Sequence, residues 1–168
     1  MAKFSDYACS SEVTDIMVKL INKFSTVFTG MDVNLIACVH TNNKANKRQP
    51  LTLRSVKYPY DVWLNKVYIV EVAQETWEEM NDKQKNLATF HVMCAIPEGA
   101  FDVTSKNYAG KKKPDHEVYD QEFAVTGGVL NWMDEENTAK DPLDNTDSAT
   151  KKVATGRKPI TAEAVASA

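Results

Sequence analysis

The stretch that decides the fold runs from Val62 to Ile96 and reads VWLNKVYIVEVAQETWEEMNDKQKNLATFHVMCAI. Its first part, Val62 to Val72, is strongly apolar and predicts a strand that is buried on both sides or covered by a helix. Gln74 to Met80 predicts a short helix. Asp82 to Ile96 keeps helical periodicity, and Pro97 ends the run because proline cannot continue a helix. We therefore expect a strand, a short helix and a longer helix in this order.

The segment before this stretch predicts one helix and two strands. Apolar residues from Val13 to Phe28 recur at spacings of three and four, which indicates a helix with one buried face. The serines at 10–11 are N-cap candidates, and Gly30 is a candidate C-terminal stop. Val33 to Val39 and Leu51 to Lys57 then predict two strands of the same sheet.

The longer helix begins with a capping signal. Asn81 or Asp82 is a good N-cap, and Gln84 stands three residues after Asn81, as in a capping box. Further along this helix, His91 and Cys94 lie one turn apart and share a face. Any chemistry that the helix supports is therefore expected on that face.

Composition limits the class of protein. The chain has 168 residues and a mass of 18.8 kDa, which suits one domain with a single core. Its formal net charge of −3 argues against a strong nucleic-acid binder or a protein of the membrane surface. The cysteines are odd in number and lack paired spacing, which favours a reducing compartment. No apolar run approaches the roughly 18 residues that span a bilayer, and we expect no secretory signal.

The carboxyl-terminal part differs in composition from the rest. From residue 134 onward the chain has few large apolar residues, and an acidic block is followed by a basic one. Such a segment cannot build its own core. We therefore expect a domain over residues 1–133 and a polar tail over 134–168, which is either flexible or becomes ordered on a partner.

Trp77, the Asp82–Gln84 pair and His91 follow the strand in a fixed order. They lie in the segments YIVEVAQETWEEM (residues 68–80), NDKQKNLATF (81–90) and HVMCA (91–95). In this order, residues 62–132 resemble the metallopeptidase-like proteins encoded by bacteriophages, where a strand and a tryptophan-containing helix precede a helix with His-Glu-Leu-x-His. The resemblance implies an α+β, zincin-like fold, with a small mixed β-sheet of about three or four strands packed against helices.

The resemblance also implies that the catalytic motif is degenerate. In such a motif two histidines one turn apart hold Zn²⁺, and the glutamate after the first histidine activates the metal-bound water. His91 matches the first histidine, but Val92 stands at the glutamate position and Ala95 at the second histidine position. Valine cannot accept a proton and alanine cannot bind a metal ion. We therefore predict no catalytic residues and no enzymatic activity.

The third metal ligand of the family has a counterpart further along. The segment PDHEVYDQEFAVTGGVLNW (114–132) is similar to the family's third-ligand region and places His116 at the ligand position. Asp115 would cap a helix that carries His116 and ends at Gly127. His91, Cys94 and His116 are thus vestigial metal-ligand candidates. A buried cysteine behaves mostly as a small hydrophobic residue, so we predict no cofactor, with zinc kept as an alternative.

Two basic segments give an alternative of a different class. They are a polar loop after the first predicted strand and a lysine cluster between the two helices of the site, and their candidate phosphate-binding residues are Lys44, Lys47, Arg48, Lys111, Lys112 and Lys113. A solvated loop explains the same pattern. Retention on DNA that weakens steeply with salt would distinguish the two explanations.

These observations leave three hypotheses. The first is a catalytically inactive metallopeptidase-like phage protein that binds another protein, of the host or of the phage, in the host cytoplasm or in a phage complex or virion, with no membrane partner. The second is a nucleic-acid-associated protein that uses the basic loops. The third is a residual zinc metalloenzyme with altered ligands. The lost base and the lost ligand favour the first.

Overall fold

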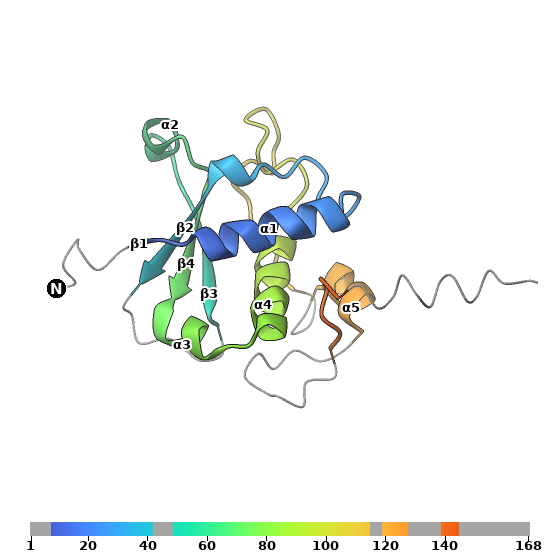
Figure 1. The fold of residues 1–168 in the computed structure, drawn as a ribbon. Helices are drawn as coiled ribbons and strands as arrows, with labels where there is room; N and C mark the ends of the chain where they lie inside the picture. Colours follow the sequence, from blue (N-terminus) through green and yellow to red (C-terminus); the bar gives the residue numbers. More distant parts are fainter. Residues whose placement is uncertain (1–7, 42–48, 115–118, 128–138, 145–168) are drawn as a thin grey trace, which may run out of the picture.

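The computed structural model describes residues 8–41, 49–114, 119–127 and 139–144. Its architecture is α+β, as predicted, with a small mixed sheet and helices that pack on one side of it (Figure 1). Helix α1 (Ser11–Lys23) contacts strand β2, and helix α4 (Asp82–Cys94) contacts strand β3 and α1. The core lies between these two helices and the sheet. No helix among the described residues is long and apolar enough to cross a membrane.

The sheet has four strands in the order β1-β2-β4-β3. The strands are β1 (Ala8–Cys9), β2 (Ile36–Thr41), β3 (Leu51–Ser55) and β4 (Tyr68–Ala73). The pairing of β2 with β4 is parallel, whereas β1 with β2 and β3 with β4 are antiparallel. In the central strand β4, Tyr68, Val70 and Val72 are fully buried, as expected for a strand between two neighbours and under helices.

The predicted strand from Val62 to Val72 is wrong over its first half. Residues Tyr60–Leu64 form the short helix α2, Asn65 adopts a left-handed conformation with φ of 49°, and the strand begins only at Tyr68. The apolar side chains of α2 are exposed, so they do not serve the core. An apolar run predicted burial here, but hydropathy alone cannot distinguish a buried strand from an exposed apolar helix.

The other predicted elements differ mainly at their ends. Val33–Leu35 form a 3₁₀ turn because the Asp32 side chain accepts a hydrogen bond from the Asn34 amide at 2.9 Å, so β2 starts at Ile36. Helix α1 ends at Lys23 instead of near Phe28. The apolar period continues past α1 because the following turn also buries side chains in the core, and Phe28 is 5% exposed.

The predictions for the two helices after the sheet are confirmed. Helix α3 spans Gln74–Glu79, and α4 begins after Asn81 with a capping box. The Asn81 side chain accepts from the Gln84 amide at 2.9 Å, and the Gln84 side chain accepts from the Asn81 amide at 2.8 Å. Both bonds satisfy amides that a helix start would otherwise leave unpaired.

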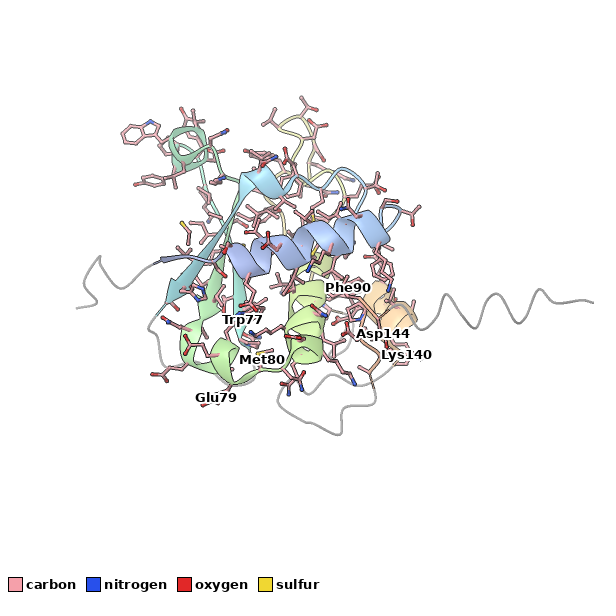
Figure 2. All side chains as sticks on the ribbon, viewed as in Figure 1. Trp77, Glu79, Met80, Phe90, Lys140 and Asp144 are labelled. Atoms are coloured by element: carbon pink, nitrogen blue, oxygen red, sulfur yellow. The ribbon has the colours of Figure 1, made fainter. Side chains whose placement is uncertain are left out.

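Aromatic residues fill the core beside α4. The ring of Phe90 meets Phe24 and Phe28 edge to face, with centroid distances of 5.4 and 5.3 Å. Trp77 and Met80 are buried where α3 approaches α4 (Figure 2). Edge-to-face pairs add to the free energy gained from burial, so this cluster holds α4 against the turn after α1.

Residues 139–144, which we expected in the polar tail, pack instead on the domain. Ala139 is buried, and the Lys140 amide donates to the Thr126 carbonyl at 2.8 Å. Asn86 of α4 donates to the Asp141 carboxylate at 3.0 Å, and Lys23 of α1 donates to the Asp144 carbonyl at 2.7 Å. This segment therefore joins α1, α4 and α5 (Asp120–Thr126). The rest of the predicted tail lies outside the described residues.

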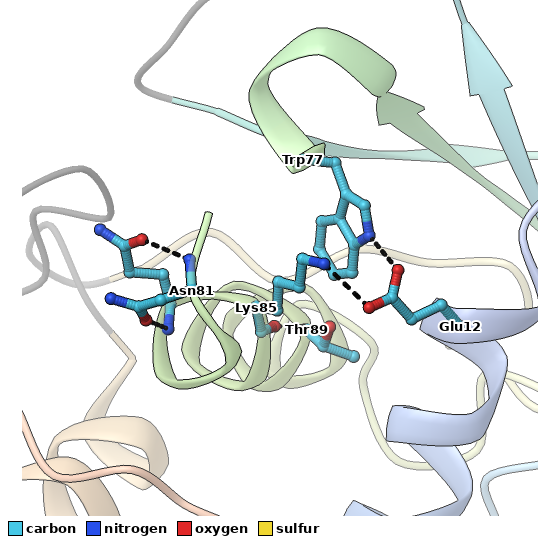
Figure 3. A network of polar contacts seen from close by, with 6 residues as sticks. Glu12, Trp77, Asn81, Lys85 and Thr89 are labelled. Atoms are coloured by element: carbon cyan, nitrogen blue, oxygen red, sulfur yellow. Dashed lines mark hydrogen bonds and ion pairs between the residues drawn. The ribbon is translucent and has the colours of Figure 1, made fainter. Parts of the chain in front are cut away.

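A polar network joins the start of α1 to α3 and α4 (Figure 3). The Glu12 carboxylate accepts hydrogen bonds from the Trp77 indole at 2.8 Å and from the Lys85 ammonium at 2.9 Å. Lys85 also lies over the Trp77 ring, 5.4 Å from its centroid. Lys85 first, and then Trp77, hold the pKa of Glu12 below its ordinary value of 4.5.

The lowered pKa of Glu12 predicts a pH dependence of stability. A carboxylate with a lowered pKa stabilises the fold above its unfolded-state pKa, and this contribution is lost as the pH falls through the lowered value. Glu12→Gln should therefore reduce the free energy of unfolding at neutral pH, by less than about 1 kcal/mol because the side chain is half exposed. Urea titrations at a series of pH values check this. Wild type and variant should converge only when the pH is below the lowered pKa of Glu12, and parallel pH profiles would contradict the assignment.

Candidate functional site

Helix α4 and its C-cap Ala95 carry the residues that correspond to the catalytic motif in the resemblance, and most of them are buried. Val92 is 5% exposed, Cys94 1% and Ala95 8%, and all three belong to the hydrophobic core. The His91 side chain is 27% exposed. The face that would carry catalytic groups in a metallopeptidase is therefore a packing face here, apart from His91.

His91 is paired with a carboxylate that the sequence analysis missed. Its Nδ1 lies 2.7 Å from Oε2 of Glu122 on α5, and the Glu122 side chain is fully buried. The Tyr119 amide also donates to this oxygen, at 3.4 Å. Because Nδ1 is engaged with Glu122, a metal ion would have to bind His91 at Nε2.

Tyr119 completes the surroundings of this pair. Its ring centroid lies 5.2 Å from that of His91, and its hydroxyl donates to the Lys112 carbonyl at 3.1 Å. Burial raises the pKa of Tyr119 to about 12, so the phenol stays protonated and remains a donor. The contacts of Tyr119 and Glu122 with their neighbours attach α5 to α4.

Sequence reasoning placed the start of α5 too early. The helix begins at Asp120 with Tyr119 as N-cap, and Gly127, with φ of 63°, ends it as predicted. Glu122 is the third residue of α5, a position from which a side chain can reach back to the N-cap amide. The spacing of Glu122 from the N-cap was therefore the one feature of the sequence that could have predicted a capping role for it. Asp115 and His116 lie outside the described residues.

Cys94 is buried in the hydrophobic core. Burial raises the pKa of its thiol well above the ordinary value, and the nearby Glu122 carboxylate raises it further, while Lys112 acts in the opposite direction. Metal ligation requires the thiolate. Cys94 therefore acts as a small apolar residue of the core, which is the behaviour that we expected from a buried cysteine.

The described residues bring together no complete set of zinc ligands. No group of three His, Cys, Asp or Glu side chains in the described part of the chain has the spacing to hold a metal ion. Glu122 Oε1 is buried and has no hydrogen-bond partner among the described residues. In the hydrogen bonds and ion pairs of these residues, His91 is the only histidine that contacts the Glu122 carboxylate. His116, which the resemblance assigns as a ligand, lies outside these residues.

Two hollows of the described surface have linings that do not include the His91–Glu122 pair. One of about 230 Å³ is formed by the turn after α1 and the loop after α4, and its lining includes Phe28, Ile96 and Lys112. Another of about 290 Å³ is formed by α1, α4 and Leu143. Neither lining contains His91 or Glu122.

Of the predicted phosphate-binding residues, the structure describes only the lysine cluster at 111–113. Lys111, Lys112 and Lys113 are exposed, and the Lys111 ammonium is close to the Leu53 carbonyl of strand β3, at 3.4 Å. The other predicted phosphate-binding residues, Lys44, Lys47 and Arg48, lie outside the described residues. Their role in nucleic-acid binding therefore stays a prediction.

An exposed apolar surface around α2 was not anticipated. We call it the α2 surface, and it consists of Tyr58, Tyr60, Val62, Trp63 and Leu64. Their exposed fractions range from 54% for Leu64 to 83% for Trp63. Helix α2 itself has no buried residue. Large contiguous apolar surfaces of this kind mark interaction sites in many proteins.

Comparison of the chain with protein-family models, with curated proteins and with solved structures gives no match. The features of the molecule that bear on function are the His91–Glu122 pair, the buried face of α4 and the α2 surface.

Proposed function

We propose that this chain is a metallopeptidase-like bacteriophage protein that has lost catalysis and acts by binding another protein. The observation that carries this proposal is the packing of α4. The position of the catalytic base holds Val92, the position of the second metal ligand holds Ala95, and both side chains are buried in the core. General-base catalysis needs a titratable group within hydrogen-bond reach of the reacting water, and valine has none.

The state of His91 supports the same proposal. In metallopeptidases of this type, a carboxylate that accepts from the distal ring nitrogen orients a metal-ligating histidine. Glu122 has that relation to His91, at 2.7 Å. In this chain the pair also has a structural role, because it attaches α5 to α4. A zincin-like ancestry, in which an orienting carboxylate is retained for packing, explains the arrangement.

Binding of a protein is supported by the α2 surface. The described fold does not use these side chains for its own core, and Trp and Tyr are the residues most enriched among the energetic centres of protein interfaces. The partner would be a host protein or another phage protein, met in the host cytoplasm or in a phage complex or virion.

The loss of catalysis is tested with the purified full chain. We expect no stoichiometric zinc by elemental analysis after loading with zinc and gel filtration, and no chelator-sensitive cleavage of casein. His91→Ala, checked for folding by circular dichroism, should leave both readouts unchanged. Stoichiometric zinc that is lost in His91→Ala, together with cleavage that a chelator inhibits, would overturn the proposal.

A further inference from the structure

The α2 surface has the composition of an anchor for a partner. All five of its side chains are at least half exposed, and the most exposed are Trp63 at 83% and Tyr58 at 81%. Large aromatic side chains each bury about 150–250 Å² when they are covered, so this surface exposes on the order of 600 Å² of largely apolar area. That value is at the upper end of the largest patch on an ordinary monomer, about 300–600 Å².

The backbone under this surface is held in place by polar contacts. Asp61 Oδ2 accepts from the Tyr108 hydroxyl at 3.0 Å, and the Lys66 amide donates to the Asp61 carbonyl at 3.3 Å. The Lys66 ammonium donates to the Asn34 carbonyl. The apolar side chains are therefore presented by an ordered segment, and an ordered segment loses less entropy on binding than a flexible one.

The charge next to the α2 surface is positive. Lys57 and Lys66 flank it in the chain, and Asp61 is the single acidic residue between them. Both carboxylate oxygens of Asp61 are engaged, because Oδ1 accepts from the Val62 amide at 2.9 Å and Oδ2 from Tyr108. A complementary partner would therefore carry acidic groups around an apolar centre.

The shape argues against a second copy of this chain as the occupant. Helix α2 projects from the body of the domain (Figure 1). Two projecting surfaces of the same kind lack the concave site that would cover Trp63. An anchor that inserts into a cleft of a different protein fits the observations better.

From these observations we infer that the α2 surface docks into an apolar cleft of another protein whose rim carries carboxylates. This inference rests on the proposed protein-binding function and adds the surface and the chemistry of the partner. Trp63 and Tyr60 fill the cleft, and Lys57 faces the acidic rim. The acidic groups accelerate association, and the aromatic side chains supply most of the affinity.

The test begins with the full chain carrying the photo-cross-linker p-benzoylphenylalanine in place of Trp63. Irradiation in cells that contain the partner should give an adduct with a different protein, joined at a cleft lined by apolar residues and by Asp or Glu. With that partner purified, Trp63→Ser should weaken binding by about 30-fold or more. Lys57→Glu should slow association and remove part of its salt dependence.

The matched control is Phe123→Ser, which removes another exposed aromatic side chain, from α5, and should change affinity by less than about 3-fold. Adducts between two copies of this chain, adducts with lipid, or no protein adduct would overturn the inference. So would a partner that binds Trp63→Ser and wild type equally, and in that case the protein-binding function would still stand. Chelator-sensitive cleavage of casein would instead refute the proposed function itself.

Discussion

Replacing Trp77 by alanine is expected to lower the free energy of unfolding by about 3–5 kcal/mol, the largest effect among single substitutions that we predict. Trp77 is 1% exposed and is the largest fully buried side chain of the described residues. Its removal leaves a cavity between α3 and α4 and deprives the Glu12 carboxylate of its indole donor. Denaturant unfolding monitored by far-ultraviolet circular dichroism measures the change.

Trp63→Ala is the matched control for this substitution. The same side chain is removed from a position that is 83% exposed, where substitutions usually change stability by less than about 0.5 kcal/mol. If Trp77→Ala lowers the free energy of unfolding no more than Trp63→Ala does, then Trp77 is not a core residue.

His91→Ala is expected to lower the free energy of unfolding by about 3 kcal/mol, because it leaves a buried carboxylate without its hydrogen-bond partner. Glu122 is fully buried, and its other polar contact among the described residues, with the Tyr119 amide, is long at 3.4 Å. Glu122→Gln keeps the shape and an acceptor oxygen, so its cost should be nearer 1 kcal/mol. Equilibrium unfolding in urea at neutral pH measures both.

The double variant His91→Ala with Glu122→Gln separates this explanation from simple loss of packing. The amide that replaces the carboxylate carries no charge, so the double variant should be more stable than His91→Ala alone. If the two changes are additive, then His91 acts through its packing with Tyr119, and the buried pair contributes nothing of its own.

Local signals in the sequence predicted the parts of the fold that depend on local interactions. The start of α4 was predicted because the capping box joins residues only three positions apart, Asn81 and Gln84, and their side chains satisfy the helix whatever surrounds it. Gly127 was predicted as the end of α5 because the left-handed conformation there favours glycine.

The parts that depend on distant packing were not predicted. Glu122 is separated from His91 by 31 positions, and no periodicity connects two residues that come together only when α5 docks on α4. The α2 segment was predicted as a buried strand because its apolar residues match that pattern. Burial depends on what covers a segment, and no described element covers α2.

The segment 139–144 also decides where the chain can be shortened. A version that stops at Met133 would lack Ala139, which is 1% exposed. The Thr126 carbonyl would lose its hydrogen-bond donor, and the Asn86 amide and the Lys23 ammonium would lose their acceptors. Work with a trimmed protein should therefore keep every residue through Asp144. If the chain is cut before Asp144, a difference in binding or stability from the full chain would reflect damage to the domain. It could not be assigned to the residues after Asp144.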